Sequence, residues 1–264
     1  MENYSQNLQN KIVAYYEGYY QSCGLKDFQE RAKSRLNEEA RDEKKLEILK
    51  SIFNFDFTNK KHLIVGAGTA GLGVALKQKY NGEVFGIEPS SEEFEIIKGK
   101  CQEAGLNFSN FKKEFAEKIS FSDNFFDFVY CITVIEHVVD VEKSIEEMIR
   151  VLKPGGFLYI ETPNYKFPVE KHYKIIFPTF LPKFLGKLYL VMRGKPTDFI
   201  GSINFLTENK VNKILANQEN IKWLRIYQSN FLSTKKGVKG FLLKILTKKL
   251  FIYPEQEIII QKIA

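Results

Sequence analysis

The order of apolar and helical segments predicts an α/β fold with a mainly parallel sheet covered by helices on both faces. Between residues 61 and 164, short apolar runs of strand length alternate with segments of helical periodicity, and the connections are short. This alternation indicates βαβ units with right-handed crossovers. The first apolar run, residues 62–68, ends in glycines, which is typical of a buried parallel strand that enters a tight turn.

The chain before this alternation is predicted to be helical. Residues 1–52 contain no proline, and a charged stretch extends from Lys26 to Lys50. We therefore assign residues 1–60 as an amino-terminal helical extension and residues 61–264 as the main domain. With 264 residues and 44% hydrophobic residues, the chain can bury a full core.

Strands and helices follow one another in a regular order from residue 62. The helix at 90–105 begins with serines and acidic residues and ends at a glycine, a pattern of capping at both ends. The next helix is amphipathic, with Ile145, Met148, Ile149 and Leu152 on one side. The strands of this part are predicted at residues 62–68, 83–89, 126–135 and 157–162, and this second helix at 141–156.

The alternation stops after Thr162. Residues 163–206 contain five prolines and many aromatic residues, which indicates an inserted segment that we call the lid. A helix at 207–218 with Thr207 as its N-cap, a strand from Asn220 and a last strand at 257–263 complete the domain. We expect the basic apolar segment 177–195 to pack on the domain as a cap.

A glycine-rich turn and an acidic residue indicate a nucleotide-like ligand. Gly66-Ala67-Gly68-Thr69-Ala70-Gly71 is a GxGxxG pattern between a predicted strand and a helix, where glycine allows close approach of the backbone to a ligand. Glu88 ends the next strand, where a carboxylate accepts both hydroxyls of a ribose. Nicotinamide cofactors use the same arrangement, so these two features alone leave an oxidoreductase open.

Four sequence pieces in one order resemble the class I S-adenosylmethionine-dependent methyltransferases. They are GAGTAG, GIEPS, FSDNFFDFVYCITVIEHV and RVLKPGGFLYIETPN, and together they cover roughly residues 61–164. The resemblance is to the branch that includes ubiquinone-biosynthesis O-methyltransferases and bacterial enzymes that modify surface glycans. It implies a Rossmann-like, seven-stranded, mostly parallel sheet, with the last strand antiparallel at or near an edge and S-adenosylmethionine as cofactor. We expect residues 1–60 to add helices over the cofactor cleft and residues 163–206 to form a lid over the acceptor site.

The resemblance also implies the cofactor contacts of this chain. The turn residues and Glu88 would hold the methionine moiety and the ribose, and Pro89 and Ser90 would lie beside the adenine. Relatives often carry Asp-Ala before the next motif, where this chain has Phe115-Ala116, so ring packing and backbone contacts would replace the polar contact to the adenine. The predicted contacts are Gly66, Ala67, Gly68, Gly71, Glu88, Pro89, Ser90, Phe115, Ala116, Ile132 and Thr133.

A second departure from the family concerns metal binding. Some relatives use Glu-x-x-Glu-His to bind a divalent ion, whereas this chain has Thr133 in place of the first acid, followed by Glu136 and His137. One ligand is thereby removed, so we expect no required metal.

Two histidines are candidate general bases. His137 follows a strand at its carboxyl end, where open α/β sheets bind their ligands, and His172 lies in the lid. A structural role, in capping or at an exposed lid position, is the alternative for each, and His62 at the start of the first strand is expected to be structural. Candidate acceptor contacts are Tyr165, Tyr173, Lys174 and Arg193, with simple packing as the alternative for the tyrosines.

The charge is distributed unevenly along the chain. Residues 1–164 carry 21 Lys and Arg against 26 Asp and Glu, whereas residues 165–264 carry 18 against 6. The basic half suits an anionic acceptor or an anionic membrane surface, with solvated lysine as the alternative. The basic apolar segment 235–251 is a candidate for peripheral membrane contact. We expect no nucleic-acid partner, because aromatic RNA-binding signatures and the Asn/Asp-Pro-Pro-Tyr tetrad of base methylation are missing from the sequence.

The cysteines and the amino terminus indicate the compartment. Cys23, Cys101 and Cys131 are scattered without a CxxC pattern, and the first residues lack a basic start followed by an apolar core. We expect a cytoplasmic protein, with peripheral contact at the inner face of a membrane as an open addition. The predicted function is methyl transfer to an oxygen of a sugar, sugar nucleotide or phosphorylated precursor of a surface polysaccharide. A quinone or lipid-like acceptor and a nicotinamide-dependent oxidoreductase are the alternatives.

Overall fold

The computed structural model describes residues 4–177, 179, 181–226 and 252–263. A seven-stranded sheet has the order β3-β2-β1-β4-β5-β9-β8, in which β1 to β5 are parallel and β9 is antiparallel to both of its neighbours. The predicted seven-stranded, mostly parallel sheet is confirmed, and the last strand lies next to the edge. The strands are β1 Lys61–Val65, β2 Glu83–Ile87, β3 Phe111–Lys112, β4 Phe126–Ile132, β5 Leu152–Pro163, β8 Ile221–Ile226 and β9 Glu255–Lys262.

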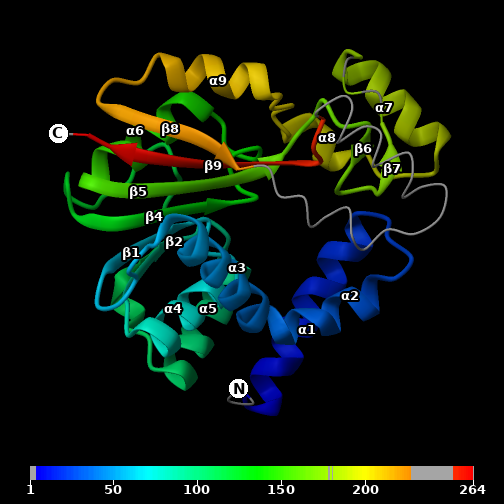
Figure 1. The fold of residues 1–264 in the computed structure, drawn as a ribbon. Coiled ribbons are helices and arrows are strands. Elements are labelled where there is room, and N and C mark those ends of the chain that lie inside the picture. Colours follow the sequence, from blue (N-terminus) through cyan, green and yellow to red (C-terminus); the bar gives the residue numbers. More distant parts are fainter. Residues whose placement is uncertain (1–3, 178, 180, 227–251, 264) are drawn as a thin grey trace.

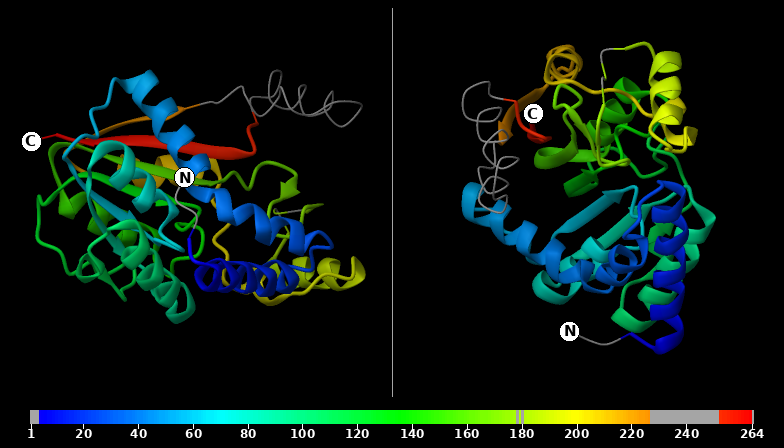
Figure 2. Two further views of the ribbon diagram at one scale, coloured as in Figure 1. Left: turned by 90° about the horizontal axis from the view of Figure 1, so that it is seen from below. Right: turned by 90° about the vertical axis from the view of Figure 1, so that its right-hand side faces the viewer.

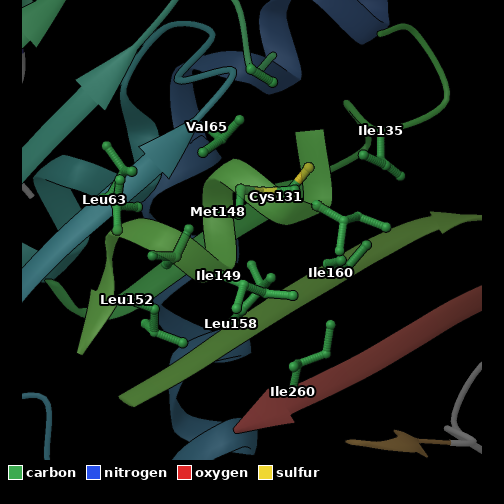
Figure 3. Packing of buried hydrophobic residues seen from close by; sticks show 14 of the residues in the cluster. Leu63, Val65, Cys131, Ile135, Met148, Ile149, Leu152, Leu158, Ile160 and Ile260 are labelled. Carbon is green, nitrogen blue, oxygen red and sulfur yellow. The ribbon is translucent and has the colours of Figure 1, made fainter. Parts of the chain in front are cut away.

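Helices cover both faces of the sheet (Figure 1). Because successive side chains of a strand point to opposite faces, Leu158 and Ile160 of β5 join one core while Tyr159 joins the other. Figure 3 shows the first of these cores, where Met148 and Ile149 of α6 pack against β5 and β9. One face carries α6 Val141–Val151 and α9 Glu208–Ala216, and the other carries α3 Glu38–Phe53, α4 Gly71–Tyr80 and α5 Ser91–Ala104.

The predicted capping residues are observed. The Ser90 side chain accepts a hydrogen bond from the Glu93 amide at the start of α5, and Gly105 ends that helix with a φ of 69°. The Thr207 side chain accepts from the Lys210 amide at the start of α9. These side chains satisfy amide groups that the first turn of a helix leaves unpaired.

The predicted end of α6 is wrong. The sequence pattern extended this helix to Gly156, whereas α6 ends at Val151 and Leu152 already pairs with Phe126 of β4. Register is regained only where Phe157 pairs with Phe128, so the intervening Lys-Pro-Gly-Gly forms an irregularity within β5 rather than a helix stop. Strand β3 was not predicted as an element, because two residues are too short to show a pattern.

The amino-terminal extension packs against the main domain. It consists of α1 Gln6–Ser22, α2 Phe28–Ser34 and a 3₁₀ turn Arg35–Asn37, followed by α3. The buried residues Leu8, Ile12 and Tyr16 of α1 form a core with Ala32 of α2 and Ile96 of α5. Figure 2 shows α1 running alongside the sheet domain at the end where the β6–β7 hairpin and α7 also lie.

Residues 163–206 form a small unit of their own. It contains a hairpin of β6 Val169–Glu170 and β7 Ile175–Ile176, then α7 Lys183–Met192 and α8 Asp198–Ser202. A core of Tyr173, Phe177, Leu190 and Ile200 holds these elements together. The Lys195 ammonium donates to the Gly24 carbonyl at 2.7 Å, which joins the unit to the end of α1.

The expected packing of segment 177–195 as a cap is only half right. Gly186 and Leu190 of α7 are buried, but five apolar side chains on the opposite face of this helix are exposed. Segment 235–251 lies outside the described residues. Among the residues that are described, no helix combines the length and apolar character needed to cross a bilayer.

Candidate active site

A cavity of about 400 Å³ lies at the carboxyl ends of β1, β2 and β4. Open α/β sheets bind ligands at this edge, because the loops that follow parallel strands meet there. Nine of the residues predicted from the sequence line the cavity: Gly66, Ala67, Gly68, Gly71, Glu88, Pro89, Ile132, Thr133 and His137.

The glycine-rich turn presents backbone to the cavity. Gly66 and Gly68 have φ values of 65° and 53°, a left-handed conformation that side chains rarely adopt. A Cβ on Gly66 would lie 2.3 Å from a methyl group of Val134, whereas a Cβ on Gly68 would have no atom closer than 3.7 Å. Gly66 therefore serves packing, and Gly68 leaves open space where a ligand approaches the backbone.

Glu88 is fixed by the same turn. Its carboxylate accepts hydrogen bonds from the amides of Gly68 at 2.9 Å and Ser90 at 3.0 Å, and the residue is only 6% exposed. Burial, followed by the charge of the neighbouring Glu93, raises the pKa of Glu88. A ligand that donates hydroxyl groups here would relieve part of the cost of burying this charge.

The residue after β4 is held in a strained conformation. Thr133 has a φ of 55°, which is unusual for a β-branched residue. Its amide donates to the Glu161 carbonyl at 2.7 Å, and its hydroxyl donates to the Ile132 carbonyl at 2.7 Å. Strained backbone of this kind is concentrated at functional sites, and this residue borders the cavity.

Three predicted adenine contacts do not line the cavity. Ser90 caps α5, Ala116 is buried in the core against the sheet, and Phe115 points outward with 66% of its side chain exposed. The roles of these residues toward the cofactor stay predictions.

The amino-terminal helices supply part of the cavity wall, as expected of an extension that lies over the cofactor cleft. The sequence did not single out which of their residues do so. The wall residues from this extension are Tyr15, Tyr16, Tyr19, Arg35, Glu38, Arg41 and Asp42.

A buried polar network joins this extension to the glycine-rich turn. The Glu38 carboxylate accepts hydrogen bonds from the Thr69 hydroxyl and, at 2.6 Å, from the Lys100 ammonium. The Tyr16 hydroxyl lies 3.1 Å from that of Thr69. Burial raises the pKa of Glu38, but Lys100 more than offsets this, so that its pKa is below the ordinary value. The extension therefore holds the turn through a charged contact.

The two candidate bases are in contact. Nε2 of His172 lies 3.3 Å from Nε2 of His137, and Nδ1 of His172 lies 2.6 Å from the buried carboxylate of Glu170. Burial, followed by the charge of His172, lowers the pKa of His137 to about 4. The alternative of an exposed lid position does not describe His172, whose side chain is 10% exposed.

Glu136 lies behind this histidine pair. It is 1% exposed, and its carboxylate accepts a hydrogen bond from the Thr162 hydroxyl at 2.9 Å. Burial raises its pKa to about 7. Among the described residues, no three His, Cys, Asp or Glu side chains are grouped so that they could hold a metal ion.

The predicted acceptor contacts do not line the cavity. Tyr165 is buried and packs against Phe205, with 5.0 Å between ring centroids, and Tyr173 belongs to the core of the lid. Lys174 is exposed in the hairpin, and Arg193 ends α7. Their roles toward an acceptor stay predictions.

His62 has the structural surroundings that the sequence suggested. It is fully buried at the amino end of β1, between the Tyr130 hydroxyl at 3.1 Å and the Phe57 carbonyl at 3.0 Å. Burial lowers its pKa to about 4.

The comparisons with known proteins agree with this geometry. Residues 63–160 match the family model of a methyltransferase domain. The chain is 36% identical to the demethylmenaquinone methyltransferase of Staphylococcus haemolyticus over 133 residues, which are 49% of this chain and 54% of that protein. It is 37% identical to the norajmaline N-methyltransferase of Rauvolfia serpentina over 102 residues, which are 38% of this chain and 35% of that protein.

A solved structure shows the same fold. The YcgJ protein of Bacillus subtilis superposes with a TM-score of 0.53 at 17% identity, over 83% of this chain and 98% of that one. The chain spans about half or less of the length of the curated relatives it matches.

Within a sheet of class I architecture that extends from β1 to β9, residues 63–160 match a methyltransferase domain. Its cofactor is S-adenosylmethionine. The residues present fit this cofactor, since the open space above Gly68 and the buried carboxylate of Glu88 suit the methionine and ribose parts of a nucleoside.

Proposed function

We propose that this chain transfers a methyl group from S-adenosylmethionine to a hydroxyl oxygen of a small-molecule acceptor. The observation that carries this proposal is the contact between His137, which lines the cofactor cavity, and His172, which is hydrogen-bonded to Glu170. When bound, the cofactor supplies an activated methyl group, so the protein has mainly to position the acceptor and remove its proton.

The histidine pair provides a place for that proton. The 3.3 Å contact joins two Nε2 atoms, so a single proton must lie between them. The low pKa of His137 keeps its ring neutral at ordinary pH and able to accept a hydrogen bond from a hydroxyl. A proton taken up by the pair is best stabilised on His172, because the Glu170 carboxylate faces its other nitrogen.

The charge of the cavity wall favours a neutral acceptor. Its described side chains include the carboxylate of Glu38, which is paired with Lys100, and three further carboxylates, those of Asp42, Glu88 and Glu93, against two guanidinium groups, those of Arg35 and Arg41. Such a surrounding favours a sulfonium cation and disfavours a phosphorylated acceptor in the same space. The basic residues that would have held a phosphate, Lys174 and Arg193, do not line the cavity.

The similarity to a demethylmenaquinone methyltransferase points in the same direction. A quinone precursor is neutral, which matches the charge of the wall described above, and its ring hydroxyl groups could accept a methyl group. We therefore propose a quinone-like phenol as the acceptor class. A sugar or sugar nucleotide, which the sequence pattern favoured, is the second candidate, and the sugar nucleotide differs by the anionic phosphates that it carries.

Methyl transfer from labelled S-adenosylmethionine tests the proposal directly. The wild-type chain is offered a quinone precursor and a set of sugar nucleotides, and His137→Asn and His172→Ala are compared with it. We expect transfer to the phenol, with at least one variant about 100-fold slower, the usual contribution of a positioned base. The affinity of His172→Ala for S-adenosylmethionine should stay within about twofold, since His172 does not line the cofactor cavity.

Two results would contradict this proposal. Transfer to sugar nucleotides alone would replace the acceptor class. Full turnover in both variants on the true acceptor would show that the histidine pair removes no proton.

A further inference from the structure

The outer face of α7 is apolar and exposed. Ten large hydrophobic side chains are exposed in the described part of the chain, and five of them belong to this ten-residue helix. Their spacing along the chain places them on one stripe of the helix. They are Phe184, Leu185, Leu188, Val191 and Met192, with exposed fractions of 69%, 36%, 56%, 63% and 76%.

The helix is held firmly with this stripe outward. On its inner side Leu190 is fully buried, and a Cβ on Gly186 would lie 2.8 Å from Ile200, so there is no room for the helix to rotate. The Tyr189 hydroxyl donates to the Ile176 carbonyl at 2.8 Å, and the Ile176 side chain is a sixth exposed apolar group, 69% exposed. Figure 1 shows α7 at the outer edge of the molecule, on the far side of the β6–β7 hairpin from the sheet.

Basic side chains border the stripe. Lys183 and Lys187 lie on one flank of α7 and are exposed, and Arg193 follows at its end. The Lys183 ammonium donates to the Gly201 carbonyl at 2.8 Å, a partner that leaves its charge uncompensated. In residues 163–206 the acidic residues are Glu170, which is buried against His172, and Asp198.

We propose that α7 docks on an anionic phospholipid surface, lying parallel to it with the stripe in the interface. An apolar face bordered by basic groups is the pattern of interfacial helices. Ten residues extend about 15 Å, half of a hydrocarbon core of about 30 Å, so α7 lies on a bilayer and does not cross it. A second copy of this chain is disfavoured as the occupant, because the same basic groups would face each other.

Docking would bring the acceptor side of the cavity to the membrane. The unit that carries α7 also carries His172, which contacts His137 in the cavity wall. A lipid-like acceptor would then reach the site from the bilayer. This consequence rests on the proposed acceptor class, whereas docking itself does not.

Vesicle flotation tests the docking proposal without any turnover. The full chain is mixed with phosphatidylcholine vesicles with and without phosphatidylglycerol. We expect flotation only with the anionic lipid, weakened by salt. Leu188→Glu with Val191→Glu should lower the partition coefficient at least tenfold, and Lys183→Gln with Lys187→Gln should lower it about 25-fold, at about fivefold per lost basic charge.

A matched control is Ile52→Glu with Leu224→Glu, which places the same two charges at exposed apolar positions of α3 and β8, 51% and 47% exposed. It should float like the wild type, and all variants should keep their melting temperature and affinity for S-adenosylmethionine. The inference is overturned if the wild type ignores anionic vesicles, or if the α7 variants float as well as the control. It is also overturned if the wild type is a dimer that Leu188→Glu dissociates. If methyl transfer to soluble phenols fails while flotation persists, only the proposed function is contradicted.

Discussion

Removing the buried ammonium of Lys100 should destabilise the extension that walls the cavity. Lys100 is fully buried, 2.6 Å from one Glu38 oxygen, and also bonds the Glu39 carboxylate. In Lys100→Met, the Glu38 carboxylate stays buried with Arg35 as its closest cation, at 3.9 Å. Breaking one partner of a buried pair costs about 3–5 kcal/mol, a large share of the roughly 5–15 kcal/mol that stabilises a typical domain.

The measurement is urea denaturation followed by circular dichroism, together with calorimetric titration of S-adenosylmethionine. We expect a lower unfolding free energy and weaker cofactor binding, because Glu38 also holds Thr69 in the glycine-rich turn. Adding Glu38→Gln to Lys100→Met removes the stranded charge and should recover part of the loss. Lys79→Met is the control, since Lys79 pairs with Glu43 and Glu47 on the surface. If Lys100→Met is no less stable than this control, the network does not hold the extension.

Four further outcomes follow from the site. Glu88→Ala should weaken S-adenosylmethionine binding by about 1.5–3 kcal/mol for each charge-assisted hydrogen bond lost. Calorimetry measures this affinity, and a wild-type value would mean that Glu88 does not bind the ribose. Gly68→Val should abolish S-adenosylmethionine binding in a chain that circular dichroism shows to be folded, because the valine side chain would enter the space of the ligand. An unchanged affinity would show that the ligand does not approach the backbone at Gly68. Turnover should persist in EDTA because Thr133 replaces an acidic ligand, and a loss restored by a divalent ion would reverse this expectation. His62, with its pKa lowered to about 4, stays neutral in the folded chain while the unfolded chain takes up a proton below about pH 6.5. The contribution of His62 to stability should therefore be full above that pH and fall by about 2 kcal/mol from pH 7 to pH 5. His62→Gln should remove about this much of the slope in denaturant titrations and leave the share of His137, whose pKa is also lowered to about 4; an unaltered slope would assign it to other groups.

Local chemistry explains why much of the fold was predictable from the sequence. Apolar runs of strand length, the glycines of the first turn and the caps Ser90 and Thr207 are local signals, and each appears where it was expected. The end of α6 was missed because the pairing of Leu152 with Phe126 begins before the helical pattern stops. That choice depends on a neighbouring strand, which the local pattern does not contain.

The cofactor side of the site was also largely determined by the sequence. Gly66, Gly68 and Glu88 follow β1 and β2 directly, and the carboxyl ends of parallel strands necessarily meet at one edge of the sheet. A turn and a strand end therefore suffice to place these residues around one cavity.

Only the tertiary structure decided which distant residues complete that cavity. The contact between His137 and His172 spans 35 positions, and that between Glu38 and Lys100 spans 62. Neither is implied by periodicity, because each depends on how a separate unit docks on the sheet. The outward stripe of α7 has the same origin: the sequence shows a basic apolar segment, but the packing of Gly186 and Leu190 determines which face of the helix is buried and which is left to solvent.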